Sequence, residues 1–336
     1  MTDSVPALRP TDALRAIVAR FAGVRHLPLF LKLAVSIGFV ALISRHVDGR
    51  ALIERLHGQS LFWLAGTALL GLVQIALLSV RWQQILKALG GESGFGSAVA
   101  VTYMGCFFGA FLFGPTGGDV ARAMLAPSSS LGRRGIVHSV LFERVASVIG
   151  LGLAVTPLVL FDVGPFARSA PLLATLAVVP ASFVGIALIV WLARAIGDRA
   201  GALFFPLRGI DRSWHRVARR WPRFAATVAL ATIGQLLVAV EAWTLAQAQH
   251  LGVSLIDFAI LMPPVMLVVA LPISAGGWGV REGAVVAALA LVGVGTAPAL
   301  VLSVELGLIG TLVSLPGGAI WLRRCFLRLD GAARDN

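Results

Sequence analysis

Two glycine-rich stretches place charged residues between apolar runs of the chain. The first reads Gly117-Gly118-Asp119-Val120-Ala121-Arg122, and the second, from Leu271 to Gly283, contains Arg281-Glu282. Helix ends freed by such breaks expose backbone N–H groups that bind anions, and glycines let a ligand approach the backbone closely. Arginine adds a planar fork of donors that fits phosphate. These residue types therefore predict a site for a phosphate-bearing lipid headgroup.

The candidate substrate-binding residues combine these stretches with charged residues inside neighbouring apolar runs. Carboxylates among them could contact a cationic or hydroxylated headgroup or carry a proton, and the same charges could instead form structural ion pairs between helices. For Glu241 and Glu305 taken singly, both interpretations stay open. The candidates are Gly117, Gly118, Asp119, Arg122, Glu143, Arg144, Glu241, Ser274, Gly276, Gly277, Trp278, Arg281, Glu282 and Glu305.

The stretch from Leu271 to Gly283 allows two structural interpretations. Pro272 and its glycines make a continuous helix through this point unfavourable. Irregular backbone and ionised groups at membrane depth are costly unless protein or water covers them. The residues therefore favour a hairpin tip that lines a polar cavity, and a plain loop at the membrane surface is the alternative.

No catalytic constellation is recognisable in the sequence. The six histidines lack ligand spacing, and there is no Gly-x-Ser-x-Gly, Walker A or dinucleotide-binding motif. The two cysteines, Cys106 and Cys325, predict neither a disulfide framework nor a metal site. We expect no catalytic residue, metal or cofactor.

The composition predicts an all-α polytopic membrane protein. The chain has 336 residues, of which 58% are hydrophobic and 13% charged, and its mean hydropathy is +0.89; soluble domains carry about 25% charged residues. The net charge of +12 lies mostly in short segments between apolar runs. This pattern indicates membrane orientation and contact with anionic headgroups, and it argues against nucleic-acid binding. The arginine-rich segment 194–223 is accordingly expected to be an orientation and lipid-surface element.

The apolar runs predict about six full spans and two broken or re-entrant hairpins. One integral-membrane domain at 27–322 lies between basic tails at 1–26 and 323–336. Arg81-Trp82 is expected to anchor the end of a span at the interface. The piece 117–126 is too short to cross, because a spanning helix needs about 20 residues. The expected spans are 27–44, 61–80, 138–161, 171–196, 225–249 and 298–322, with hairpins between 97 and 126 and between 258 and 294.

Lys and Arg distribution predicts that both termini are cytoplasmic. Basic residues gather in the tails and in the segments assigned to the inner side, whereas the outer segments contain only Arg45, Arg50, Arg55 and Arg168. The order span, span, hairpin, span then occurs twice in opposite orientation, in half-repeats of about 27–161 and 171–322. Such an inverted repeat is a transporter architecture, although apolar helices with glycine breaks can also match by chance.

Several motifs together resemble the lysylphosphatidylglycerol synthase transmembrane-region family of flippase-like membrane proteins. The resemblance implies a membrane region that, in bifunctional members, moves aminoacylated phosphatidylglycerol to the outer leaflet. A separate cytosolic domain of those members transfers the amino acid, and we expect it to be absent here. Some stand-alone members of this family are associated with glycolipid, polyprenyl-phosphate or hopanoid pathways, so the resemblance implies lipid translocation without naming the lipid. The motifs are Arg81-Trp82, Gly117 to Arg122, Glu143-Arg144, Pro272 to Gly283, and Leu315-Pro316-Gly317-Gly318 before Trp321.

Three functions fit these observations. The favoured one is flipping of a phospholipid or lipid-linked headgroup between leaflets of the bacterial cytoplasmic (inner) membrane, through a cavity between two opposed hairpins. The alternative is a membrane-embedded transferase that uses a lipid-phosphate donor in cell-envelope or glycolipid synthesis, with Asp119 or Glu282 as base. A non-transporting assembly factor is the third. Expected partners are anionic or polyprenyl-linked membrane lipids; a synthase or glycosyltransferase partner and an oligomer would also fit.

Overall fold

The computed structural model describes residues 60–127, 131–161, 180, 209–270 and 277–334. Within these residues every element is helical and there is no strand. The expected tail at 1–26 and span at 27–44 lie outside the described residues, as does all of 171–196 except residue 180. Four described helices are long and apolar enough to cross a membrane: α4 (Leu61–Leu89), α7 (Gly132–Leu160), α10 (Trp221–Ala248) and α13 (Thr296–Arg334).

Helix α4 continues nine residues beyond the span expected to end at residue 80, and it ends at Leu89. Trp82 is therefore inside the helix and only 1% exposed, and its Nε1 donates to Ser139 Oγ at 3.0 Å. The expected interfacial anchor at Arg81-Trp82 was wrong. An apolar run indicates where lipid can cover a helix, but polar partners on α7 let α4 extend farther.

The first predicted hairpin is present as two short helices that reverse direction. Helix α5 (Phe95–Phe108) leads through a π-helical turn, η1 (Gly109–Phe113), into α6 (Gly114–Leu125). A Cβ built on Gly118 would lie 2.6 Å from the carbonyl oxygen of Gly105, whereas the same residues in a straight helix would be about 20 Å apart. The chain turns back at η1, so the glycine-rich stretch forms the return helix rather than the bend. Neither leg reaches the about 20 residues of a full span.

The second predicted hairpin corresponds to α11 (Leu255–Ala270) and α12 (Val280–Ala290). These helices have 16 and 11 residues, so each is also shorter than a full span. The two pack together through buried apolar side chains, among them Phe258 and Leu261 on α11 and Leu289 on α12. Their connection, residues 271–276, lies outside the described residues.

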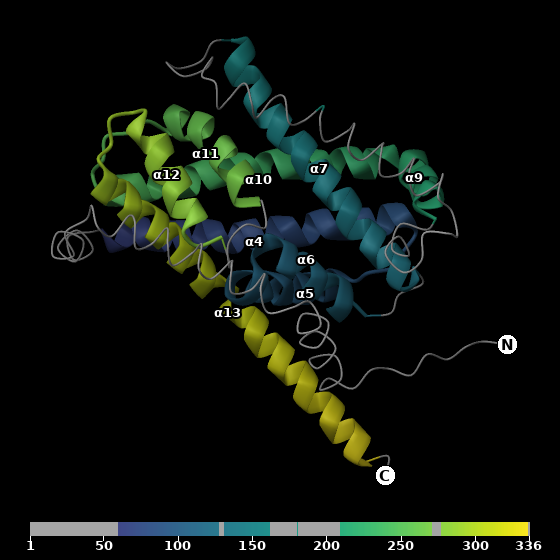
Figure 1. The fold of residues 1–336 in the computed structure, drawn as a ribbon. Coiled ribbons are helices and arrows are strands. Elements are labelled where there is room, and N and C mark those ends of the chain that lie inside the picture. The colour runs from purple at the N-terminus through teal and green to yellow at the C-terminus, as the bar shows by residue number, and fades with distance from the viewer. Residues whose placement is uncertain (1–59, 128–130, 162–179, 181–208, 271–276, 335–336) are drawn as a thin grey trace, which may run out of the picture.

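Glycines let α13 pack closely on the rest of the bundle. Helices α4 and α10 lie side by side, α7 crosses them, and α13 runs obliquely past α5 (Figure 1). A Cβ on Gly317 of α13 would lie only 2.5 Å from the carbonyl carbon of Tyr103 on α5. Small residues at such crossings let helix backbones approach, which is how helices associate in lipid. Helix α13 continues to Arg334, past the expected end of the last span at 322.

A short helix, α9 (Ile210–Arg219), covers the neighbouring ends of α4 and α10 at the right of Figure 1. Its apolar side, with Ile210 and Val217, packs against Ile85 and Leu89 near the end of α4. The remaining face is polar and rich in arginine. An amphipathic helix with a basic face is typical of helices that lie along a membrane surface, and α9 falls within the segment 194–223 for which such a role was predicted.

Candidate functional site

A continuous chain of ion pairs connects α4, α6 and α7. Its five members, Arg81, Asp119, Arg122, Glu143 and Arg144, are called the Glu143 cluster. Glu143 Oε1 accepts hydrogen bonds from Nε and Nη2 of Arg81 at 3.1 and 3.0 Å, and Oε2 accepts from Nη1 of Arg122 at 2.7 Å. Arg122 Nη2 also donates to Asp119, whose other oxygen accepts from Arg144 Nε. The cluster therefore alternates three guanidinium groups with two carboxylates.

Side-chain exposure increases outward from Glu143 through Arg122 and Asp119 to Arg144, and Arg81, on the other side of Glu143, is 12% exposed. The side chain of Glu143 is 1% exposed, that of Arg122 7%, that of Asp119 13% and that of Arg144 44%. A buried charge is tolerated when it is paired and hydrogen-bonded, and both oxygens of Glu143 are. The inner members are thus suited to hold the hairpin in place. The outer pair, Asp119 and Arg144, is accessible to another partner.

Local packing fixes Arg122 at the centre of the cluster. Its guanidinium carbon lies 5.9 Å from the centroid of the Trp82 ring, a cation–π distance. A Cβ on Gly105 would lie 2.9 Å from Arg122 Cδ, so glycine on α5 leaves space for this side chain. The backbone of Gly105 also lies against Gly118, where a Cβ would be only 2.6 Å from the Gly105 carbonyl oxygen. In this structure the glycines bring α5 and α6 together around the arginine.

The position of Arg81 locates the cluster along the bundle. Arg81 lies eight residues before the end of α4 at Leu89, which corresponds to about 12 Å of helix. Half of the hydrocarbon core of a bilayer is about 15 Å thick, and headgroups add about 5–8 Å on each side. If that helix end is level with the headgroups, the cluster lies just inside the hydrocarbon region, on the side that α9 covers.

A second charged group lies at the start of α12. Arg281 donates from Nη2 to Glu282 Oε1 at 2.7 Å, and its guanidinium carbon lies 4.5 Å from the Trp278 ring centroid. Glu282 Oε2 accepts from the backbone N–H of Gly279, which precedes the helix. A glutamate that accepts from the residue before its helix caps that helix. Helix α13 accommodates Arg281 at Gly307, where a Cβ would lie 2.6 Å from Arg281 Nη1.

Two further carboxylates are buried in the second half of the chain. Glu305 on α13 is 5% exposed and accepts from Gln249 Nε2 at 3.0 Å. Glu241 on α10 is 9% exposed, and its Oε1 has no hydrogen-bond partner in the part of the chain that the structure describes. A buried polar atom without a partner needs an explanation, such as a ligand, a water molecule or a bound proton.

The structure thus divides the sequence-predicted residues into groups. Asp119, Arg122, Glu143 and Arg144 come together, with Gly117 and Gly118 buried beside them on α6. Ser274 and Gly276 lie outside the described residues. Sequence reasoning missed the role of Arg81, because the apolar run appeared to end there. The remaining groups are Gly277, Trp278, Arg281 and Glu282 before and at the start of α12, Glu305 with Gln249, and Glu241 by itself.

The long apolar helices, the short paired helices and the charged cluster between them define a multi-pass helical membrane protein. Residues 29–318 match the family described as Lysylphosphatidylglycerol synthase TM region. The match covers most of the chain, so the protein belongs to this family, and the resemblance drawn from the motifs is confirmed. The comparison with curated proteins found no match.

Proposed function

We propose that the protein moves a phospholipid, or a lipid-linked headgroup, from one leaflet of the bacterial cytoplasmic membrane to the other. Its family relates it to lipid functions of the cell envelope. The observation that carries the proposal is the Glu143 cluster, in which arginines extend from a buried carboxylate to a half-exposed guanidinium at Arg144. Arginine binds phosphate through two parallel N–H donors.

The cluster suggests how a phosphate would enter without unfolding the hairpin. Asp119 accepts from both Arg122 and Arg144. A phosphate diester can replace the Asp119 carboxylate as the partner of Arg144, because both are anions with oxygens in similar positions. Meanwhile Glu143 keeps Arg81 and Arg122 in place through its two oxygens. An exchange of partners at the outer pair would thus receive the headgroup while the inner pairs hold the helices.

An inverted repeat would give such a protein two alternating access states. In support of it, each hairpin is followed by a long helix with a buried glutamate, Glu143 on α7 and Glu305 on α13. We further propose that both termini are cytoplasmic and that α9 marks the cytoplasmic side, since the described basic residues are concentrated there. Glu241, whose Oε1 has no hydrogen-bond partner among the described residues, is the candidate for proton coupling.

Leaflet exchange in proteoliposomes tests the proposal. Labelled phosphatidylglycerol, its lysyl form and a polyprenyl-phosphate sugar are supplied separately to wild type, Arg144→Gln and Arg133→Gln. Arg133 is the matched control, because it is an exposed arginine on the same helix outside the cluster. Loss of one charge-assisted hydrogen bond, about 1.5–3 kcal/mol, should slow transfer of the accepted lipid about 10- to 150-fold in Arg144→Gln. Arg133→Gln should transfer at the wild-type rate.

Two results would contradict lipid translocation. In the first, folded wild-type protein moves none of the three lipids. In the second, a lipid-phosphate donor is consumed in detergent, where there are no leaflets, and turnover falls in Asp119→Asn; this result would favour the transferase. Equal rates for wild type and Arg144→Gln with a lipid that does move would refute the role given to Arg144.

A further inference from the structure

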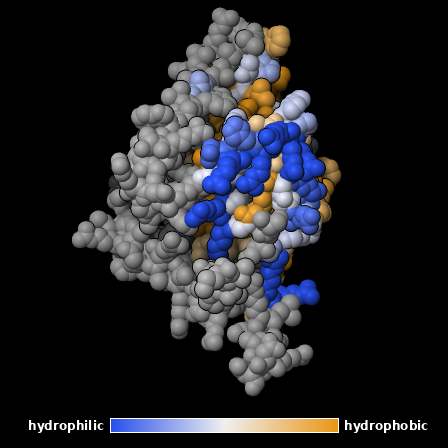
Figure 2. All heavy atoms as spheres, turned by 90° about the vertical axis from the view of Figure 1, so that its right-hand side faces the viewer, coloured by the Kyte–Doolittle hydropathy of each residue, from blue (hydrophilic) through white to orange (hydrophobic). Residues whose placement is uncertain are grey.

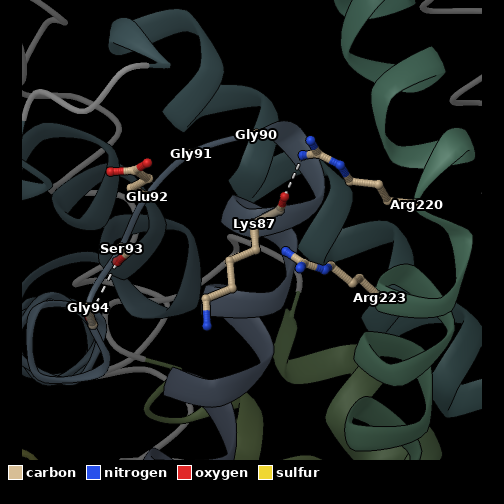
Figure 3. A pocket seen from close by; sticks show the side chains of 8 residues that line it. All are labelled: Lys87, Gly90, Gly91, Glu92, Ser93, Gly94, Arg220 and Arg223. Atoms are coloured by element: carbon tan, nitrogen blue, oxygen red, sulfur yellow. Dashed lines mark hydrogen bonds between the residues drawn. The ribbon is translucent and has the colours of Figure 1, made fainter.

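A basic pocket lies between the end of α4 and the start of α10, apart from the Glu143 cluster. It is open to the surface and has a volume of about 620 Å³. Figure 3 shows the side chains of Arg220, directly before α10, and Arg223, on α10, reaching toward α4, with Glu92 on the loop across the pocket. We call it the Lys87 pocket, and its lining residues are Lys87, Gly90, Gly91, Glu92, Ser93, Gly94, Arg220 and Arg223.

The charges of this pocket are unbalanced and partly held in place. Arg220 donates from Nη1 to the carbonyl oxygens of Lys87 and Ala88, at 2.8 and 3.3 Å, and so caps the last turn of α4. In the described parts of the chain, the side chains of Lys87 and Arg223 have no hydrogen-bond or carboxylate partner. Three cations therefore face a single carboxylate, Glu92. Such a pocket attracts an anion.

Exposed tryptophans locate this end of the molecule at the membrane surface. Trp214 on α9 is 50% exposed and Trp221 at the start of α10 is 67% exposed, and tryptophan is enriched where membranes meet water. Figure 2 shows hydrophilic residues gathered on this face of the molecule, with hydrophobic ones among them. Together with the amphipathic helix α9, they favour a position of the Lys87 pocket at the level of lipid headgroups.

A smaller, more apolar pocket lies beside the Lys87 pocket, on the same loop. It has a volume of about 90 Å³, and Gly91, Glu92, Ser93 and Gly94 line both pockets. Its other walls include the apolar side chains of Trp82, Leu86, Pro127 and Ile136. A polar pocket beside an apolar one matches a lipid, whose charged headgroup adjoins its glycerol backbone and chains. A free inorganic anion has no apolar group that could contact the side chains of the smaller pocket.

We propose that the Lys87 pocket binds an anionic phospholipid through its phosphate, with Lys87, Arg220 and Arg223 supplying the positive charge. The phosphate would lie between the three cations, and the smaller pocket would take the first carbons of the lipid. This site is at the end of the bundle, and the inference does not depend on the proposed translocation. A protein that moves no lipid could still hold one here.

Native mass spectrometry of the protein in mild detergent measures this binding. Phosphatidylglycerol and phosphatidylcholine with identical chains are compared at 0.15 M salt, and inorganic phosphate is added in a third series. The test variant is Lys87→Gln/Arg223→Gln, which spares Arg220 and its cap on α4. The matched control is Arg212→Gln/Arg219→Gln, which removes two exposed arginines of α9 outside the pocket.

Wild type should bind phosphatidylglycerol in preference to phosphatidylcholine. Each basic residue near an anionic lipid contributes to the binding free energy. The loss of two such residues should weaken the affinity of the test variant for phosphatidylglycerol about 30-fold. The two control arginines do not line the pocket, and salt at this concentration weakens the effect of charges that do not contact the lipid, so the control should lose less than about threefold. Glu92→Gln removes the opposing carboxylate and should tighten binding, which no loss of folding could imitate.

Four outcomes would overturn the proposal. Equal binding of both lipids would mean that the pocket does not select negative charge. Equal losses in the test and control variants would mean that only the general surface charge attracts lipid. Displacement of phosphatidylglycerol by inorganic phosphate at similar concentration would assign the pocket to a free anion. Unchanged or weaker binding by Glu92→Gln would contradict the charge argument.

Discussion

Glu143→Gln is the sharpest test of the ion pairs that hold the α5–α6 hairpin. The substitution keeps the shape of the side chain and removes its charge. Both carboxylate oxygens accept from arginines, Arg81 at 3.0 Å and Arg122 at 2.7 Å. A glutamine can offer one oxygen, so its NH₂ group would face one guanidinium, donor against donor.

The expected loss of stability follows from the burial of the partners. The side chains of Arg81 and Arg122 are 12% and 7% exposed, and that of Glu143 is 1% exposed. Removing one member of a buried pair leaves an uncompensated charge and costs about 3–5 kcal/mol. Arg144 is 44% exposed, and pairs of exposed side chains contribute about 0–1 kcal/mol. Arg144→Gln should therefore cost less than about 1 kcal/mol, although it removes a member of the same cluster.

Reversible unfolding in mixed micelles of detergent and SDS measures these differences. Wild type, Glu143→Gln and Arg144→Gln are compared, and Arg122→Gln together with Arg122→Gln/Glu143→Gln completes a double-mutant cycle. Neighbouring charged residues should show a coupling of about 0.5–3 kcal/mol, so the double variant should be less destabilised than the sum of the singles. If Glu143→Gln lies within about 0.5 kcal/mol of wild type, the cluster does not hold the hairpin and the reasoning fails.

Two further predictions concern packing. Gly317→Ala should destabilise the protein by about 1–3 kcal/mol, because the new Cβ would collide with the backbone of Tyr103. Gly310 is on the same helix and has nothing within 4 Å of its Cβ position. Gly310→Ala should therefore stabilise the protein by up to about 1 kcal/mol. Equal unfolding midpoints for Gly317→Ala and Gly310→Ala would contradict the close contact at Gly317. Trp82→Phe should lower the free energy of unfolding by at least about 1 kcal/mol, because it removes the buried hydrogen bond to Ser139. Adding Ser139→Ala to Trp82→Phe should lower it little further. If the second substitution cost as much as the first, the pairing of the two side chains would be contradicted.

The sequence was sufficient to predict the class of protein and the short hairpins. A run of apolar residues indicates how much lipid a helix can cover, and that property depends on local composition alone. For the same reason the four described spans begin and end within several residues of the predicted ones, apart from the extension of α4 and the longer C-terminal end of α13. Four of the five members of the Glu143 cluster, Asp119, Arg122, Glu143 and Arg144, were also among the candidate residues chosen from the sequence.

Partners of the charged residues were decided only by tertiary packing. Arg81 appeared to end a span, and only the approach of α7 supplies the carboxylate that lets the helix continue. Arg281 follows a glycine-rich stretch, and only the packing of α12 on α13 brings its guanidinium against Gly307. The Lys87 pocket joins the loop after α4 to the start of α10, segments more than a hundred residues apart. Apolar length is a local property, whereas the pairing of a charge depends on which distant segment packs against it, so the sequence determined the helices and the tertiary structure determined the sites.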